Sequence, residues 1–323
     1  MSALPRVAVV GVGHMGRFHA AKLRQLASEG ELVFAGVCDL DAERAREVAR
    51  ELEAEVLHDL GEVSLAASAA CVAVPGVEHA RVAGALLEAG LDVLVEKPIA
   101  STRDEARALI RSAREKGRVL QVGHVERFSA AMQKVLPVLQ RPRSIEAHRI
   151  GPYKGRATDV SVVLDLMIHD LDLIALLAGS EVERVEAIGV PVLSTTEDIA
   201  NARLRFENGC VANVTASRVS LEPLRKIRVF QSDAYLSIDL SASQIQIARR
   251  EGKPVAGSGA LPKIHAESLR FDPLDALLAQ DRAFARAVRE RTAPQVSGED
   301  GYRALDLALR IQESLPAFEE LGA

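Results

Sequence analysis

An imidazole and two carboxylates are expected on one side of a single helix. The segment 163–177 reads VLDLMIHDLDLIALL, and at about 100° per residue Asp165, His169 and Asp172 lie close together on its surface. The remaining side chains are almost all apolar, which predicts a helix that is buried on nearly every side. Burying charged groups is costly unless they pair or serve a site. The pattern predicts either an acid–base site, with His169 able to accept a proton near neutral pH, or a structural Asp–His network.

A lysine is the second candidate group, in the tripeptide Glu96-Lys97-Pro98 that follows an apolar strand predicted over 93–95. Proline fixes its own φ and favours an extended residue before it, so the ammonium of Lys97 can project from the end of the strand. There it could stabilise negative charge that develops on a substrate oxygen. Only eight of the 40 basic residues are lysines, which speaks against chance placement. A surface lysine beside a turn is the simpler alternative.

A glycine motif follows the first apolar strand and leads into a predicted helix. Glycines there allow a tight turn, a close approach of a pyrophosphate and close helix packing, while the N-terminus of the helix faces the negative charge. Alone, the motif is also compatible with a turn that holds no ligand. The residues of this motif, which would contact a dinucleotide, are Gly11, Gly13, His14, Met15 and Gly16.

Asp39 ends the second predicted strand, 23 residues after Gly16. A carboxylate at this place accepts the ribose hydroxyls of NAD, and it would repel the 2′-phosphate of NADP. Arg44 is near enough in sequence to keep NADP open as the less favoured cofactor. By itself, Asp39 could also cap the helix that follows. Taken together, the glycines, the strands and the acid predict an NAD site.

Strands and helices alternate through the first 123 residues. This alternation predicts an α/β fold with a Rossmann-type, doubly wound parallel sheet, in which ligands bind beyond the carboxyl ends of the strands. The glycine motif, Asp39 and Lys97 all follow such ends. The strands are predicted over 7–10, 32–38, 70–74, 93–95 and 119–123, and the helices over 15–27, 41–53, 80–88 and 103–116.

The remainder, 124–323, has the pattern of a second, α+β domain built on a large, mostly antiparallel open sheet. Apolar and polar residues alternate over 200–206, and Asn208-Gly209 then gives a strong hairpin signal. A loop is predicted over 252–262, and a C-terminal helix at about 300–321 is free to pack back on the first domain, 1–123. Further strands are predicted over 210–217, 226–231, 235–240 and 244–248, and helices over 274–291 and 301–320.

The composition is that of an ordinary globular protein. The 323 residues carry 40 basic and 45 acidic side chains, a net charge of −5, and 48% of them are hydrophobic. The charges are interspersed, so there is no basic footprint for nucleic acid, and no run of about 18 apolar residues could span a membrane. The three cysteines are widely spaced and odd in number, so they predict no disulfide framework. The sequence has no further cluster of His or Cys beside the 165–172 segment, so no metal site is expected. We therefore expect a cytoplasmic protein with no metal, nucleic-acid or membrane partner.

These motifs together resemble the glucose-fructose oxidoreductase / inositol dehydrogenase / MocA-like (Gfo/Idh/MocA) family. The resemblance rests on GxGxxGxxH at Gly11–His19, on Glu96-Lys97-Pro98 and on Asp-x-x-x-His-x-x-Asp at Asp165–Asp172. It implies hydride transfer between NAD(P) and a sugar or cyclic polyol, and a homo-oligomer, a dimer or tetramer, that forms through the C-terminal sheet. It implies Lys97, Asp165 and His169 as catalytic residues. It also places at the cofactor the residues Val74, Pro75, His79 and Glu96.

A narrower resemblance is carried by GHVERF at 123–128, VVLDLMIHDLDL at 162–173, DIANARLRFENGC at 198–210 and SRVS at 217–220. These segments are similar to family members that oxidise the 3-hydroxyl of UDP-N-acetylglucosamine, whose 3-keto product feeds the synthesis of the diamino sugar of lipid A. A diphosphate needs cations, and arginine can engage two of its oxygens at once. Besides the catalytic residues, the candidate substrate contacts are Arg127, Tyr153, Lys154, Arg156 and Asp172.

Two other functions stay open at this point. A dehydrogenase of a free sugar, inositol or another polyol would use the same catalysis without contacts to a diphosphate. A non-catalytic, NAD-sensing regulator would need no buried base. In the catalytic interpretations, His169 accepts the hydroxyl proton and Asp165 orients its ring. Lys97 then stabilises the alkoxide while hydride leaves for the nicotinamide.

Overall fold

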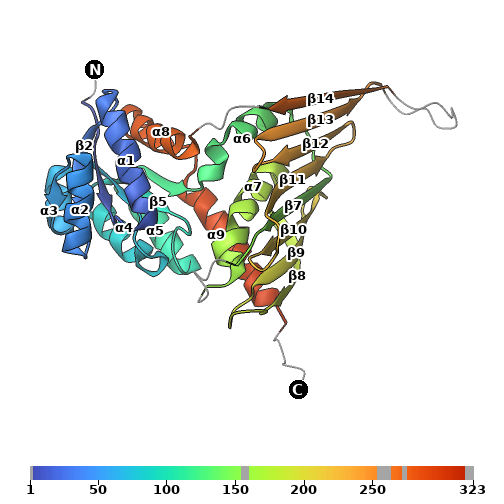
Figure 1. The fold of residues 1–323 in the computed structure, drawn as a ribbon, viewed down its shortest axis with the longest axis horizontal. Coiled ribbons are helices and arrows are strands. Elements are labelled where there is room, and N and C mark those ends of the chain that lie inside the picture. The colour runs from blue at the N-terminus through green and yellow to red at the C-terminus, as the bar shows by residue number, and fades with distance from the viewer. Residues whose placement is uncertain (1–2, 154–159, 253–262, 271–274, 317–323) are drawn as a thin grey trace. The chain divides into compact units, whose positions relative to one another are not determined.

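The computed structural model describes residues 3–153, 160–252, 263–270 and 275–316 (Figure 1). The chain forms two compact units, and neither is continuous in sequence. The first contains the residues up to Phe128 together with Asp275–Leu305, and the second contains Ser129–Leu274 together with the residues from Asp306 onward.

A six-stranded parallel sheet forms the centre of the first unit. Its strands are β1 (Arg6–Val10), β2 (Val33–Cys38), β3 (Val56–Leu57), β4 (Ala69–Val72), β5 (Asp92–Glu96) and β6 (Leu120–Gly123). They lie in the order β3-β2-β1-β4-β5-β6, and every neighbouring pair is parallel. This is the strand order of a doubly wound, dinucleotide-binding sheet, so the predicted Rossmann fold is confirmed.

Helices connect these strands. Strands β1 and β4 are short, and apart from the exposed Arg6 at the start of β1 their residues are apolar and buried, as expected for parallel strands covered on both faces. Strand β3 and helix α3 are additions to the predicted elements. The helices are α1 (His14–Ser28), α2 (Ala42–Leu52), α3 (Leu60–Ala66), α4 (His79–Glu88) and α5 (Arg103–Glu115), with the short 3-10 helices η1 (Gly76–Glu78) and η2 (Val125–Phe128).

Helix α8 (Ala276–Glu290) completes the first unit, although it comes from the end of the sequence. Its residues Phe284 and Val288 share one buried apolar cluster with Val9 of β1 and Leu23 of α1. The boundary expected after residue 123 left this helix in the second domain. The structure groups it with the first because its apolar side packs there, and such long-range packing leaves no local signal in the sequence.

Helix α9 (Gly298–Ser314) is divided between the two units. Its residues up to Leu305 belong to the first unit and those from Asp306 to the second. In the second unit, Nη1 of Arg310 donates a hydrogen bond of 3.0 Å to the carbonyl oxygen of Val182. The predicted C-terminal helix therefore has residues in both units.

An eight-stranded sheet forms the second unit. Its strands are β7 (Ser144–Ile150), β8 (Val182–Val190), β9 (Ile199–Phe206), β10 (Val211–Ser217), β11 (Leu224–Phe230), β12 (Ala234–Asp239), β13 (Gln244–Arg250) and β14 (Ile264–Arg270). They lie in the order β14-β13-β12-β11-β7-β10-β9-β8. Among the described strands of this sheet, only the pair β7–β10 is parallel, so the predicted large and mostly antiparallel sheet is confirmed.

One face of this sheet is covered by a helix that runs across it (Figure 1). That helix begins as a π-helical turn, η4 (Val163–Met167), and continues as α7 (Ile168–Ala178) until Gly179, whose φ of +60° ends it. In β9, alternate residues are buried toward the covered face while the others are exposed. Before the sheet lie the short helices α6 (Ala130–Val135) and η3 (Leu136–Val138).

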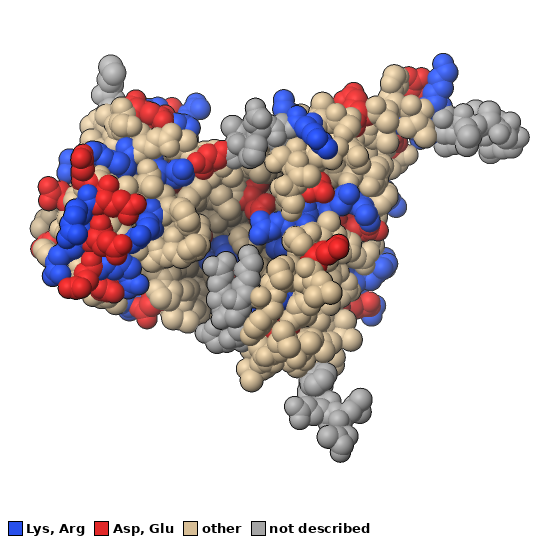
Figure 2. Space-filling model, in the orientation of Figure 1, with Lys and Arg blue, Asp and Glu red and all other residues tan. Residues whose placement is uncertain are grey.

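Charges on the helical surface of the first unit are mixed rather than of one sign. Figure 2 shows acidic and basic side chains side by side over α1 and α2. Among them, Arg17 pairs with Glu47 at 3.0 Å and Arg24 with Glu53 at 3.3 Å. Within the ranges that the structure describes, none of the helices has the length and apolar character needed to cross a membrane.

Candidate functional site

Two glycines of the motif are required by the fold itself. Gly11 follows β1 with a φ of +85°, and a Cβ there would lie 2.8 Å from the backbone of Ala73. Gly16 lies in the first turn of α1, where a Cβ would collide with the carbonyl oxygen of Gly11. No larger residue fits at either position without a backbone shift. These two glycines set the tight turn and the close packing of α1 against the sheet.

Gly13 is free of this constraint. It is the N-cap residue of α1, it supplies no side-chain cap, and a Cβ there would meet no atom within 4 Å. The N-terminus of α1 therefore has open space beside Gly13, and the N-terminus of a helix is a favourable place for a phosphate. His14 is exposed and Met15 partly exposed in this first turn. The glycine loop thus fits the pyrophosphate of a dinucleotide.

The carboxylate of Asp39 turns back from β2 toward the glycine loop. Its Oδ2 accepts a hydrogen bond of 2.8 Å from the amide of Val12, and its Oδ1 lies 3.2 Å from Nη2 of Arg44. Asp41, rather than Asp39, is the residue that caps α2. The alternative of Asp39 as a helix cap is therefore wrong, and the carboxylate lies where a doubly wound sheet binds ribose.

The ends of β4 and β5 are joined by the buried ring of His79. Its Nε2 lies 2.9 Å from the carbonyl oxygen of Val74, and its Nδ1 lies 2.6 Å from that of Pro98. Pro75 is exposed and precedes η1. Lys97 is partly exposed just after β5, and the peptide bond between Lys97 and Pro98 is cis. The ends of β4 and β5, which were predicted to face the cofactor, are thus adjacent.

Glu96 has a different environment from Lys97, because its carboxylate is buried. Its Oε1 lies 3.0 Å from Nε2 of His19, and a Cβ at Gly123 would collide with this oxygen. On the other side of the ring, Nδ1 of His19 lies 2.9 Å from Oδ1 of Asp281 in α8. The histidine that ends the glycine motif therefore links α1, α8 and the end of β5. Asp281 was not among the predicted site residues, since nothing near it in sequence indicates a partner.

The charge state of this cluster follows from its contacts. Complete burial acts to lower the pKa of His19, but the carboxylate of Asp281 raises it well above the usual value of 6.5. Burial acts to raise the pKa of Glu96, but the hydrogen bond from His19 and the charge of Lys97 hold it below its usual value. Burial also raises the pKa of Asp281, against the effect of the nearby His19. Because carboxylates lie at both ring nitrogens, the contacts favour the doubly protonated, positively charged form of His19.

The second unit carries the other predicted catalytic residues. The amide of Ile168 donates to the carbonyl oxygen of Val163, five residues earlier, so the first turn is wider than the α-helical spacing assumed from sequence. Such π turns are frequent at functional sites. Asp165 and His169 are partly exposed, while Asp172 is buried. The helix and its apolar surroundings are as predicted, but its first turn is not.

A buried ion pair fastens α7 beside His169. Nε of Arg149 in β7 donates to Oδ2 of Asp170 at 2.8 Å, and Nη2 donates to Oδ1 at 3.1 Å. Both side chains are buried. This pair was not predicted from the sequence, although an aspartate directly after the predicted base was a usable signal. The pair restrains the helix at the residue next to the proposed base.

The predicted substrate contacts have varied surroundings. Nη1 of Arg127 lies 3.3 Å from Oδ1 of Asp300, and this guanidinium holds the pKa of Asp300 below its usual value against the effect of burial. Tyr153 is 40% exposed. Lys154 and Arg156 lie outside the described residues. Among the residues that are described, no group of three His, Cys, Asp or Glu side chains could hold a metal ion.

Comparison with protein families matches both units. Residues 5–124 match the model described as "Oxidoreductase family, NAD-binding Rossmann fold", and residues 121–237 match the "GFO/IDH/MocA C-terminal domain". The two regions contain the glycine loop, Lys97, Asp165 and His169. The resemblance inferred from the motifs is therefore confirmed.

Individual proteins match over nearly the whole chain. UDP-N-acetylglucosamine 3-dehydrogenase from Acidithiobacillus ferrooxidans is 38% identical over 97% of this chain and 98% of its own. A solved structure of that enzyme superposes with a TM-score of 0.89 and 36% identity, over 96% of this chain and 97% of its own. The scyllo-inositol 2-dehydrogenase (NAD(+)) of Bacillus subtilis is 30% identical over 67% of this chain and 68% of its own. A scyllo-inositol dehydrogenase from Lactobacillus casei, solved with NAD(H), shares the fold at a TM-score of 0.80, 19% identity and 97% of both chains.

Proposed function

Because this chain belongs to the Gfo/Idh/MocA family of oxidoreductases, we propose that it transfers a hydride from a secondary hydroxyl of a sugar nucleotide to NAD. The substrate we propose is UDP-N-acetylglucosamine, oxidised at its 3-hydroxyl to the 3-keto sugar. The observation that carries this choice is the 38% identity, over 97% of the chain, to UDP-N-acetylglucosamine 3-dehydrogenase. The inositol dehydrogenase of Bacillus subtilis matches only 67% of the chain, so a free-polyol dehydrogenase is the second candidate.

NAD is the cofactor that the residues of the first unit fit best. The amides at the start of α1 and the open space at Gly13 favour a pyrophosphate. The carboxylate of Asp39 favours free ribose hydroxyls and disfavours a 2′-phosphate, which would meet it as a like charge. Arg44 is already engaged by Asp39 at 3.2 Å, which weakens its attraction for such a phosphate. We propose that the enzyme prefers NAD to NADP.

The proposed chemistry divides the work among three side chains. Bound NAD supplies the hydride acceptor at its nicotinamide ring. His169 accepts the proton of the reacting hydroxyl, and Asp165 orients the imidazole and stabilises its charged form. Lys97 donates a hydrogen bond to the reacting oxygen and stabilises the alkoxide as the hydride leaves. The products are the ketone, NADH and one proton.

A second copy of the chain is the partner that we propose for the sheet of the second unit. In β9 the side chains Asn201, Arg203 and Arg205 are exposed on the face opposite to α7. We propose that this face forms the contact of a dimer or tetramer. Light scattering coupled to size exclusion tests this, and a monomer at micromolar concentration would contradict it.

Activity measurements with a substrate panel test the function. The purified protein is mixed with NAD and, separately, with UDP-N-acetylglucosamine, UDP-glucose, N-acetylglucosamine, glucose and myo-inositol, and NADH is followed by its absorbance. We expect NADH to form with UDP-N-acetylglucosamine and not with N-acetylglucosamine. The product is reduced with borodeuteride, and mass spectrometry then shows whether deuterium is at carbon 3.

The alternatives give different results in the same panel. NADH formation with inositol or a free sugar, and none with the nucleotide, would favour the polyol dehydrogenase. Binding of NAD without turnover of any compound would favour a regulatory NAD-binding protein. The variant Lys97→Met serves as the control, because it removes the ammonium and keeps the length of the side chain.

A further inference from the structure

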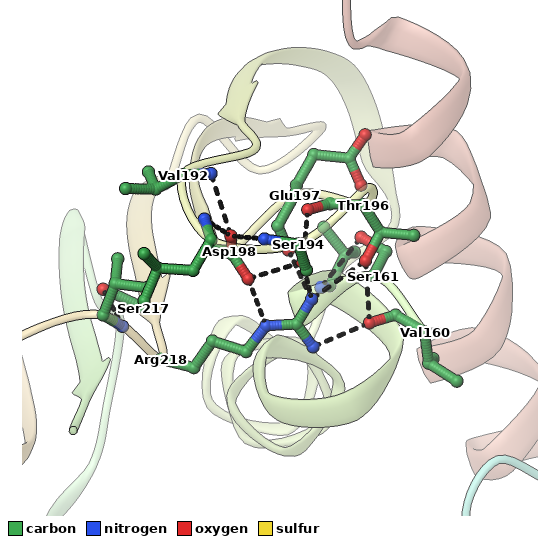
Figure 3. Close-up of polar contacts among 12 residues, drawn as sticks. Val160, Ser161, Val192, Ser194, Thr196, Glu197, Asp198, Ser217 and Arg218 are labelled. Carbon is green, nitrogen blue, oxygen red and sulfur yellow. Dashed lines mark hydrogen bonds and ion pairs between the residues drawn. The ribbon is translucent and has the colours of Figure 1, made fainter. Parts of the chain in front are cut away.

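Two of the segments that distinguish this chain within its family meet in a buried ion pair. Asp198 precedes β9 and Arg218 follows β10, and the antiparallel pairing of these strands brings the two together (Figure 3). Nε of Arg218 lies 2.7 Å from Oδ1 of Asp198. Their side chains are 7% and 0% exposed. A charged pair this deep is costly to bury, so its further contacts indicate what it does.

Asp198 shapes the loop before its own strand. Its Oδ2 accepts hydrogen bonds from the amides of Val192 at 2.8 Å, Leu193 at 2.6 Å and Ser194 at 2.9 Å. Burial acts to raise the pKa of Asp198, but these amides, the hydroxyl of Ser194 and Arg218 hold it well below its usual value. The carboxylate is thus ionised, and it fixes the loop against the guanidinium of Arg218.

Arg218 extends the network to the chain just before the helix with Asp165 and His169. Its Nη1 donates to the carbonyl oxygen of Val160 at 2.8 Å, and its Nη2 donates to the hydroxyl of Thr196 at 2.9 Å. That hydroxyl donates in turn to the same carbonyl oxygen at 3.3 Å. Figure 3 shows the guanidinium between Asp198 on one side and Val160 on the other.

Residues 160–162 lead directly into the π-helical turn. The amide of Val162 donates to the carbonyl oxygen of Glu197 at 3.0 Å, and the amide of Asp165 donates to that of Ser161 at 3.0 Å. The segment just before the helix is therefore attached at Val160 and Val162 to the loop that Asp198 and Arg218 hold. A shift of this attachment would rotate the first turn, on which Asp165 lies.

We propose that Arg218 and Asp198 are positioning residues for the reaction, which hold the first helical turn so that Asp165 and His169 meet the substrate at the productive angle. The inference rests on the proposed function, in which those two residues assist proton transfer. The planar fork of arginine makes directional contacts on several sides at once, and an ammonium cannot reproduce them. A misplacement of about 1 Å is enough to cost a large factor in rate.

The variant Arg218→Lys tests this inference, because it keeps the buried positive charge and removes the fork. We expect kcat with UDP-N-acetylglucosamine to fall at least about tenfold, while the dissociation constant for NAD changes less than twofold. We also expect the primary deuterium isotope effect on kcat, measured with substrate deuterated at carbon 3, to increase. A purely structural role would lower thermal stability without changing the isotope effect.

A matched control and a milder variant accompany this experiment. Arg228→Lys alters a cation of the same sheet that pairs with Glu146 at 3.3 Å, and it should leave both kcat and the isotope effect unchanged. Thr196→Val removes the hydroxyl between Arg218 and Val160 with little change in shape. It should lower kcat about threefold, and it keeps the test valid if the lysine variant does not fold.

Hydrogen exchange separates this inference from the proposed function. In Arg218→Lys, or in Thr196→Val, we expect faster exchange at the amides of Val162 and Asp165 and unchanged exchange in β1 and α1. If the wild-type protein oxidises no sugar nucleotide, the proposed function fails, and unchanged exchange at these amides would overturn the inference separately. If the wild-type protein is active and Arg218→Lys keeps its kcat and isotope effect, the inference fails while the function stands.

Discussion

Nε2 of His19 lies 3.0 Å from Oε1 of Glu96, and 77 residues of chain separate the two. The other ring nitrogen lies 2.9 Å from Asp281, which is 262 residues from His19. A buried cation thus joins the helix of the glycine loop, the strand end before Lys97 and a helix from the end of the chain. The three groups stabilise the fold only while the ring keeps its proton.

The stability of the protein should therefore depend on pH through His19. The folded pKa of His19 is raised above 6.5, so its contribution is complete below that pH and is lost as the pH rises through the folded value. His19→Gln should remove this dependence and cost about 3–5 kcal/mol near pH 6, because it leaves two buried carboxylates unpaired. Urea unfolding of both proteins from pH 6 to pH 10 measures the difference. His58→Gln, at an exposed histidine, is the control, and parallel curves for wild type and His19→Gln would contradict the prediction.

Two alanine substitutions in the glycine loop should separate cofactor binding from folding. Gly13→Ala adds a Cβ that meets no atom of the protein within 4 Å, so the melting temperature should stay within about 2 °C of wild type. The same Cβ would occupy the space of the pyrophosphate, and the dissociation constant for NAD should rise at least about tenfold. Gly16→Ala should lower the melting temperature and also raise the dissociation constant for NAD, because its Cβ collides with the carbonyl oxygen of Gly11. Calorimetry measures both quantities, and unchanged NAD affinity in Gly13→Ala would remove the loop from the cofactor site.

Removing the charge of Asp39 should shift the cofactor preference. Asp39→Asn keeps an acceptor for the amide of Val12 and removes one of the two carboxylates that pair with Arg44, so this cation attracts a 2′-phosphate more strongly. We expect the ratio of kcat/KM for NAD to that for NADP to fall about tenfold, which corresponds to about 1.4 kcal/mol. Initial rates with each cofactor give the ratio. The assignment is wrong if the wild-type enzyme already prefers NADP.

Loss of either proposed catalytic group should affect turnover much more than cofactor binding. Lys97→Ala removes the ammonium that stabilises the alkoxide, and His169→Ala removes the base. In both we expect NAD affinity within a few-fold of wild type and a fall in kcat of at least about a hundredfold. Fluorescence titration and steady-state rates measure these. If both variants keep the full turnover rate, Lys97 and His169 have no part in the mechanism.

The sequence predicted the first unit well because its strands are solidly apolar and its turns have a distinctive composition. It missed β7, in which Ile145, Ala147 and Arg149 are the buried residues. The arginine at the third buried position interrupts the apolar alternation, and its partner Asp170 is 21 residues away. Strand β14 was missed for a different reason, because all of its residues are exposed and no apolar face marks it.

The residues of the candidate site also fall into those that the sequence predicted and those that it did not. The glycine loop and Asp39 were found because the chemistry of a dinucleotide requires those residue types next to strand ends. Asp281 and Arg218 were not found, because each acts through a partner that only the folded chain brings near. A short motif can indicate which groups react, but it does not show which groups hold them.

The placement of α8 has a consequence for synthesis on the ribosome. Chains leave the ribosome from the N-terminus, and domains tend to fold as they emerge. Here the nucleotide-binding unit takes Phe284 and Asp281 from beyond the segment Ser129–Leu274 of the second unit, so the nascent protein cannot complete the first unit until that segment has been made. A prematurely terminated chain would thus expose the apolar side of α1 and leave the ring of His19 without its carboxylate.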